Sequence, residues 1–275
     1  MKTSQLFFAI FLFACFASCS SNRYIYSASP PNNPYFQKKG ESKLAAYYSS
    51  SNDNATAKGF ANGWDIQGAY AISDHWALTA SWFNRREQDV YKYNSSNNPF
   101  DSSIVKYKRN LFEVGGGYFI PVNPKKTITI NLYGGVAFGK FSFDDDGLDG
   151  NTNYNRTHSS KITKWFLQPS VNFMPGRYVR LSFSIKTSYV HYGNIQTNYT
   201  DNELQSFNLN ILNNKTLNFI EPCWNFQFGL PKYPWVKLDW IVSGVSNNVV
   251  YIENVRQNNV SIGLTFDFSK KTTKQ

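Results

Sequence analysis

The chain has 275 residues, a formal net charge of +10, 41% hydrophobic residues and an aromatic share of 17%. Its mean hydropathy is -0.44, and no run of about 18 apolar residues follows the amino-terminal leader, which excludes a membrane-spanning helix there. The basic residues are scattered and belong to no basic helix, zinc pattern or RNP-like stretch, so nucleic acid is not an expected partner. Composition alone leaves open an aromatic-rich β-sandwich and a membrane β-barrel, whose alternating residues keep the mean hydropathy low.

The amino terminus predicts a secretory signal peptide over residues 1–18. A short charged start precedes an apolar segment, residues 6–14, that is too short to cross a membrane as a helix. The sequence Phe-Ala-Ser-Cys at 16–19 then resembles the lipobox of bacterial lipoproteins, in which the cysteine becomes the acylated first residue. The match is relaxed, because Phe16 stands where leucine is commonest, and residues 12–15 are a poorer second match. Cleavage by ordinary signal peptidase near residue 17 or 18 is the alternative.

Cys19 is therefore the predicted lipidation site, and residues 19–41 are predicted to form a lipidated flexible tether. The stretch from Ser20 to Gly40 is rich in Ser, Asn and Pro, which is typical of linkers. Cleavage and acylation would leave Cys223 as the one remaining thiol, so the sequence predicts no disulfide framework and no metal cluster. No cofactor is expected.

Residues 42–268 alternate between apolar and polar or small side chains, most cleanly between Tyr178 and Tyr192 and over two long segments between Asn110 and Phe143. Two long alternating segments there are joined by a Pro-Asn-Pro turn. Period-two alternation indicates strands with one apolar and one polar face. Both segments reach the length of about 9–11 residues that crosses a bilayer at a tilt, which favours a barrel hairpin over a soluble strand pair.

About ten such strands are predicted, with short turns on one side and long polar loops on the other. This arrangement favours a transmembrane antiparallel up-and-down β-barrel over a sandwich; eight or twelve strands are the alternative counts. An even count returns both termini to one compartment, predicted to be the periplasm, with the long loops outside and residues 269–275 as a polar tail. The predicted strands are 43–49, 63–72, 76–90, the two arms of 104–143, 161–173, 178–192, 216–230, 235–246 and 259–268, with loops that include 144–160 and 193–215.

The inward faces of these strands carry seven charged residues. A barrel of about ten strands is narrow and is filled mainly by side chains. An isolated charge away from water is costly, so opposite charges are expected to pair in a lumen polar network that plugs the barrel. A narrow polar channel or a small-ligand site is the alternative. The seven residues are Asp65, Glu113, Arg180, Lys186, Glu221, Lys237 and Asp239.

The three histidines of the chain are the candidate catalytic residues of a hydrolase. Omptin-type proteases need a His-Asp pair and further acids at the outer rim; His75 falls at a predicted periplasmic turn, and His191 has no paired acidic motif beside it. His158 begins a His-x-Ser triplet like that of lipid A deacylases, but it falls in the predicted loop 144–160. The acidic run at 144–150 lacks the EF-hand order, so a solvated loop without metal is expected. The sequence predicts no enzyme, with an outer-rim hydrolase around His191 as an alternative.

The lipobox-like Cys19, the tether, the glycine-rich strands at 115–118 and 133–135 and the terminal strand together resemble small porin-like outer-membrane β-barrel lipoproteins of Bacteroidota-type bacteria. The last strand, Asn259 to Phe268, is similar to the β-signal read by the barrel-assembly machinery, although seven residues follow Phe268. The resemblance implies the outer membrane of a Gram-negative cell, with outer-membrane lipid and that machinery as partners. The resemblance implies location and fold but no activity. The role expected for the chain is structural or surface interaction, with an unidentified extracellular partner at the loops and a narrow pore or small-ligand carrier as the alternative.

Overall fold

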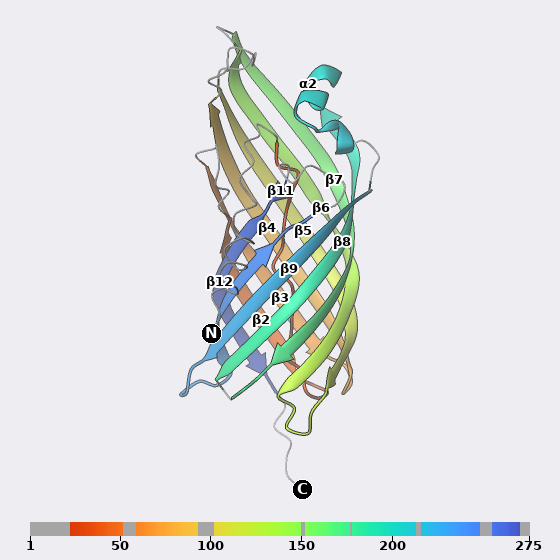
Figure 1. The fold of residues 1–275 in the computed structure, drawn as a ribbon, viewed down its shortest axis with the longest axis vertical. Helices are drawn as coiled ribbons and strands as arrows, with labels where there is room; N and C mark the ends of the chain where they lie inside the picture. The colour runs from red at the N-terminus through yellow and green to blue at the C-terminus, as the bar shows by residue number, and fades with distance from the viewer. Residues whose placement is uncertain are drawn as a thin grey trace, which may run out of the picture.

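Ten strands form a closed antiparallel barrel in the structure, a computed structural model that describes residues 23–51, 59–92, 102–149, 152–176, 178–212, 216–247 and 255–269 (Figure 1). The predicted all-β barrel of ten strands is confirmed. Around the wall the strand order is β10-β12-β2-β3-β4-β5-β6-β7-β8-β9. The strands are β2 (Ser42–Ser50), β3 (Phe60–Ala71), β4 (Trp76–Lys92), β5 (Ser102–Pro121), β6 (Ile128–Asp149), β7 (Thr152–Phe173), β8 (Val179–Thr197), β9 (Thr216–Gly229), β10 (Val236–Gly244) and β12 (Asn258–Phe268).

The two ends of the barrel differ in their connections. At one end, called here the turn end, the connections 72–75, 122–127, 174–178 and 230–235 are short. The opposite end, called the loop end, carries the remaining connections. The wall is uneven in height there, because β6 and β7 have 22 residues each whereas β2 and β10 have 9 each.

The prediction of a loop over 144–160 is wrong for its described residues, because 144–149 continue β6 and 152–160 belong to β7. Asp144 pairs with Thr157 and Phe143 with His158 in continuous antiparallel register. The reason is that alternation continues even though few residues are apolar: Phe143, Asp145 and His158 face inward and are buried. The alternation also separates the acids of a supposed calcium loop, since Asp145 points inward while Asp144 and Asp146 pair with outward lysines.

The predicted loop 193–215 is also shorter than expected. Strand β8 continues to Thr197 and is followed by helix α2 (Asp201–Ser206) and a 3-10 turn, η1 (Asn210–Leu212). A capping box between Thr200 and Glu203 starts α2, in which each side chain bonds the backbone of the other residue. Leu204, Phe207, Leu209 and Leu212 of this region are buried in the core cluster at the loop end.

An apolar belt surrounds the outside of the barrel. On β6 it covers residues 128–138, and beyond Phe138 the same outward face carries Lys140, Ser142 and Asp144. Among the described residues no helix has the length and apolar character needed to cross a membrane. Exposed members of the belt include Leu78, Trp82, Phe112, Val114, Ile120, Ile130, Leu132, Phe138, Trp165, Leu167, Val171, Tyr189, Trp224, Leu238, Trp240, Ile262 and Leu264.

The two ends of the described chain, Arg23 and Ser269, lie at opposite ends of the barrel, while both termini themselves lie outside the described residues. Phe268 pairs with Ser42 at the turn end. Arg23 instead bonds Asp145 and Ser103, which lie beside the loop-end connections of β6 and β5. The reason is that residues 23–36 run back through the barrel before β2 begins.

Candidate functional site

The lumen is occupied by residues 23–36, here called the lumen segment. All of its residues are buried except Tyr24, which is half-buried. In Figure 1 it is the red trace along the barrel interior. The predicted flexible tether is therefore wrong for this part of residues 19–41, while Cys19 lies outside the described residues. Ser, Asn and Pro suit a linker, but inside a polar lumen their side chains and carbonyls meet fixed partners instead of water.

Its proline-rich centre suits a segment that pairs with side chains and not with a sheet. Proline has no backbone N–H, so Pro30, Pro31 and Pro34 leave no donors to satisfy in the lumen. The carbonyls of Pro30, Asn32 and Pro34 accept from the wall. Gln67 Nε2 donates to Pro30 O at 2.9 Å, Gln168 Nε2 to Asn32 O at 3.2 Å and Asn172 Nδ2 to Pro34 O at 3.0 Å.

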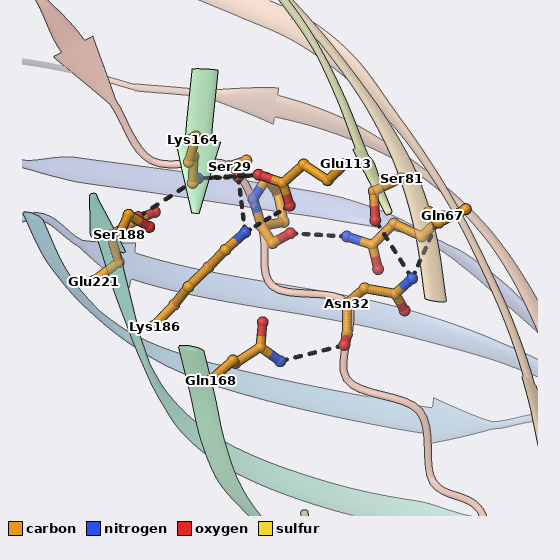
Figure 2. A network of polar contacts seen from close by, with 12 residues as sticks. Ser29, Asn32, Gln67, Ser81, Glu113, Lys164, Gln168, Lys186, Ser188 and Glu221 are labelled. Carbon is orange, nitrogen blue, oxygen red and sulfur yellow. Dashed lines mark hydrogen bonds and ion pairs between the residues drawn. The ribbon is translucent and has the colours of Figure 1, made fainter. Parts of the chain in front are cut away.

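Two asparagines fasten the segment to both sides of the wall. Asn32 Nδ2 donates to Gly68 O at 2.8 Å and Ala80 O at 3.1 Å, so one amide bridges β3 and β4 (Figure 2). On the opposite side, Asn33 Oδ1 accepts from Ser170 Oγ of β7 at 2.8 Å. Asn33 Nδ2 also donates to Ser182 of β8.

The central charge cluster consists of Glu113, Lys164, Lys186 and Glu221, and its formal charges cancel. Lys186 Nζ lies 2.7 Å from Glu113 Oε2, and Lys164 Nζ lies 3.0 Å from Glu113 Oε1 and 3.7 Å from Glu221 Oε1. All four side chains are buried. Four strands supply them, β5, β7, β8 and β9, so the cluster joins neighbouring parts of the wall across the lumen (Figure 2).

The lumen segment completes this cluster. Tyr26 OH donates to Glu221 Oε1 at 2.9 Å and accepts from Lys164 Nζ at 3.0 Å. Ser29 Oγ donates to Glu113 Oε1 at 3.2 Å and accepts from Lys186 Nζ at 3.3 Å. A buried ion pair is stable only when its remaining lone pairs and protons are bonded, and here these two hydroxyls supply such bonds.

A second cluster lies toward the loop end and joins Arg109 and Arg256 to Glu87 and Asp89. Glu87 Oε2 lies 2.8 Å from Arg109 Nη1 and 2.9 Å from Arg256 Nε, and Asp89 Oδ2 lies 2.6 Å from Arg256 Nη2. Arg256 belongs to β11 (Val255–Arg256), which pairs in parallel with β1 (Tyr26–Ser27) of the lumen segment. In the connection between β10 and β12, the described residues Val255 and Arg256 thus also lie in the lumen.

The other predicted network residues are placed separately. Asp239 accepts from Tyr47, Thr265 and Gln227 at 2.7 to 2.8 Å. Asp65 accepts from Ser49 and lies 3.8 Å from Arg85. At the turn end, Arg180 pairs with Asp267 while half-buried, and Lys237 donates to the carbonyl of Pro234. Of the seven predicted residues, only Glu113, Lys186 and Glu221 therefore meet in one cluster.

The sequence analysis missed several charged residues of the lumen, although some of them follow the same alternation of inward and outward side chains. Arg85, Glu87 and Asp89 have the inward parity of β4, and Lys164 has that of β7. Arg23 and Arg256 carried no such pattern, because they lie outside the wall strands. Among the described residues, eight basic and seven acidic side chains are buried, a net of +1, whereas the described residues as a whole hold 21 Lys and Arg against 15 Asp and Glu, a net of +6. Most of the positive excess of the described residues therefore lies outside the buried set.

The histidines do not form the predicted hydrolytic arrangements. His191 has the outward parity of β8, between the buried Val190 and Tyr192, and within the described residues it makes no ion pair. His75 stacks on Tyr118 at the turn end. His158 and Ser160 both face the interior, so the His-x-Ser triplet is not on the outer wall. The described residues also contain no group of three His, Cys, Asp or Glu side chains placed to hold a metal ion.

His158 lies beyond the apolar belt, against two phenylalanines at the loop end. Its ring stacks on Phe143 at 5.1 Å and meets Phe141 at 6.1 Å. Neither ring nitrogen has a hydrogen-bond partner among the described residues. Burial lowers the pKa of His158 to about 4, so the imidazole is neutral at pH 7.

Comparisons with known proteins were made by sequence and by structure. No protein-family description and no curated protein matches the chain by sequence. Among solved structures, the translocator domain of the autotransporter NalP from Neisseria meningitidis is 9% identical, with 84% of this chain and 88% of that chain covered and a TM-score of 0.47. The outer-membrane protease OmpT of Escherichia coli is 10% identical, with 86% of this chain and 99% of that chain covered and a TM-score of 0.42. We draw no function from these likenesses, and the barrel described above rests on the chain's own strand pairing.

From the central charge cluster we predict that removing one charge lowers the free energy of unfolding more than removing an oppositely charged pair does. Glu113→Gln leaves Lys164 and Lys186 with Glu221 as the one carboxylate between them, and we expect a loss of about 3–5 kcal/mol in the free energy of unfolding. Adding Lys186→Met should restore part of that loss, because the remaining pair is again neutral. Urea unfolding of the detergent-solubilised barrel, followed by tryptophan fluorescence, measures both. The matched control is Lys108→Gln, whose exposed pair with Asp144 should contribute little.

A second prediction concerns acid sensitivity at the loop end. The folded pKa of His158 is below its usual value, so its contribution to stability is complete above about pH 6.5 and is lost as the pH falls toward 4. Hydrogen exchange of the β6–β7 hairpin, corrected for the intrinsic rate, should therefore increase between pH 7 and pH 4.5. In His158→Phe the increase should be smaller. An equal increase in both proteins would contradict this assignment.

Proposed function

We propose that this chain is an outer-membrane β-barrel lipoprotein of a Gram-negative cell, with a structural or surface-interaction role and a lumen closed by its own amino-terminal segment. The observation that carries the proposal is the lumen segment, whose side chains and carbonyls bond the wall along the length of the barrel. A pore needs a continuous aqueous path, whereas these contacts and the paired charges occupy the lumen from Asp145 at one end to Asn172 at the other.

The apolar belt supports the membrane location. Closure leaves no free strand edge, which is the condition for a sheet to cross hydrocarbon. The outward apolar residues of β6 extend over 128–138, within the span of about 9–11 residues that a tilted transmembrane strand needs. Trp76 and Tyr118 near the turn end and Trp82, Trp165 and Tyr189 farther along the wall are outward aromatics, as expected of girdles at two interfaces.

In the proposed orientation, the loop end faces the outside of the cell and the turn end faces the periplasm, because long loops of outer-membrane barrels are extracellular. A surface partner would then meet α2 and the exposed rim of the β6–β7 hairpin. Cys19 is the proposed acylation site, and β12, which closes the barrel between β2 and β10, is the segment proposed to be read by the assembly machinery. We assign no catalytic role.

Conductance in planar bilayers tests the closed lumen. The intact protein should give no discrete openings, and deletion of residues 24–35 should give them, because the lumen then holds water in place of the segment. Since the deletion removes partners of buried charges, a milder variant is needed: Asn32→Ala with Asn33→Ala loosens the segment and should give brief openings. Heat-modifiable gel migration checks that each variant is folded. Regular openings of the intact protein would instead support the narrow-pore alternative.

The membrane location has its own test on one face of one strand. Leu132→Arg in the belt should cost about 2–4 kcal/mol of unfolding free energy, as arginine does at the bilayer midplane. Ser142→Arg, on the same outward face of β6 but beyond the belt, should cost little. The measurement is unfolding in lipid vesicles. Equal effects of the two arginines would contradict a belt immersed in lipid.

A further inference from the structure

We infer that the lumen segment carries the processed amino terminus to the loop end, so that Cys19 and the residues before Arg23 are presented at the cell surface and not in the periplasm. This inference rests on the proposed function for the side of the membrane on which the loop end lies. The path of the lumen segment through the barrel rests only on the chain's own contacts. With the proposed orientation, this path places the acyl group on one side of the membrane, which the sequence alone leaves open.

The contacts give the direction in which the segment runs. At the turn end, Lys39 N donates to Asp74 Oδ1 at 2.8 Å and Gln37 Nε2 to Lys126 O at 3.0 Å. Asn32 lies between β3 and β4 farther in, at Gly68 and Ala80. Arg23 reaches Asp145, four residues before the end of β6. Decreasing residue number therefore corresponds to progress from the turn end to the loop end.

The outer end of the segment is fixed by specific contacts. Arg23 is fully buried, and its Nε and Nη2 donate to Asp145 Oδ2 at 2.8 and 2.6 Å. Its guanidinium lies 4.8 Å from the ring centroid of Tyr91 and 4.1 Å from that of Phe207. Two donors of one guanidinium thus converge on a single carboxylate oxygen while its plane lies near two aromatic rings, and such a charge-assisted contact suits a single position. Arg23 therefore anchors the segment at the loop end.

Chain length then excludes a return to the periplasmic side. Four peptide units separate Cys19 from Arg23, which extend to at most about 14 Å. The lumen segment itself, residues 23–36, spans roughly 45 Å if extended at about 3.3 Å per residue. Cys19 cannot reach back along that path, which the segment already fills. An acyl chain on Cys19 would thus lie on the side of the loop end.

Cysteine accessibility on intact cells tests the inference. Cys223 is buried, so Ser21→Cys reports the amino terminus whether or not Cys19 is acylated. The reagent is a maleimide on a polyethylene glycol too large to cross the outer membrane. Asn153→Cys is the control for the loop end and Lys125→Cys for the turn end, since both positions are exposed. We expect Ser21→Cys to react on intact cells as Asn153→Cys does, and Lys125→Cys to react only after lysis.

The outcomes separate the inference from the proposed function. If Ser21→Cys reacts together with Lys125→Cys, or only after denaturation, the inference is overturned. If Ser21→Cys and Asn153→Cys are both shielded while Lys125→Cys reacts, the path of the lumen segment through the barrel is upheld, but the presentation at the surface and the proposed orientation fail together. If all three react alike and the protein does not sediment with outer membranes, the proposed location fails. Arg23→Ala, which releases the anchor, should leave the side of the Ser21→Cys label unchanged, because the remaining segment still fills the lumen.

Discussion

The structure depends on the pairing of charges in a lumen that offers them little water. Alternation along a closed wall sends every second residue inward, and many of these residues are charged or amide side chains. Each such group must find a partner, since an unpaired buried charge is far more costly than a paired one. The four-residue cluster around Glu113 draws its charges from four strands of the wall. The cluster around Glu87 joins Arg109 of β5 to Arg256 of β11, which lies between β10 and β12.

The lumen segment also supplies partners for the buried polar groups of the wall. A wall of ten strands encloses more space than its own side chains fill, and the segment occupies it with groups that match the wall: the hydroxyl of Tyr26 for the central cluster, the amide of Asn32 for β3 and β4, and the guanidinium of Arg23 for Asp145. Its prolines reduce the number of backbone donors that need partners. Barrel and segment are therefore complementary parts of one core, and neither is an appendage of the other.

The sequence predicted those features that repeat with a period of two. The strands, their number and the inward side of Glu113, Lys186 and Glu221 follow from local alternation, which a closed wall enforces along its whole length. The lumen segment was missed because its composition is that of a linker and its partners are remote: Arg23 and Asp145 are 122 residues apart, and Tyr26 and Glu221 are 195 apart. The hairpin extension over 144–149 and 152–160 was missed because its inward face continues from Phe143 to Asp145 and, on β7, to His158. Hydrophobicity alone therefore does not reveal the period of two.

The buried residues of the barrel and its outward residues differ in net charge. The buried side chains of the described residues carry a net charge of only +1, whereas the described residues as a whole carry +6. A nearly neutral set of buried charges has no excess field to select permeant ions. Other basic residues of the described chain lie on outward positions, such as Lys106, Lys108 and Lys140 beyond the belt, where the first two meet Asp146 and Asp144. In this barrel the interior is balanced for stability, and the charge available to anionic surroundings is on the outside.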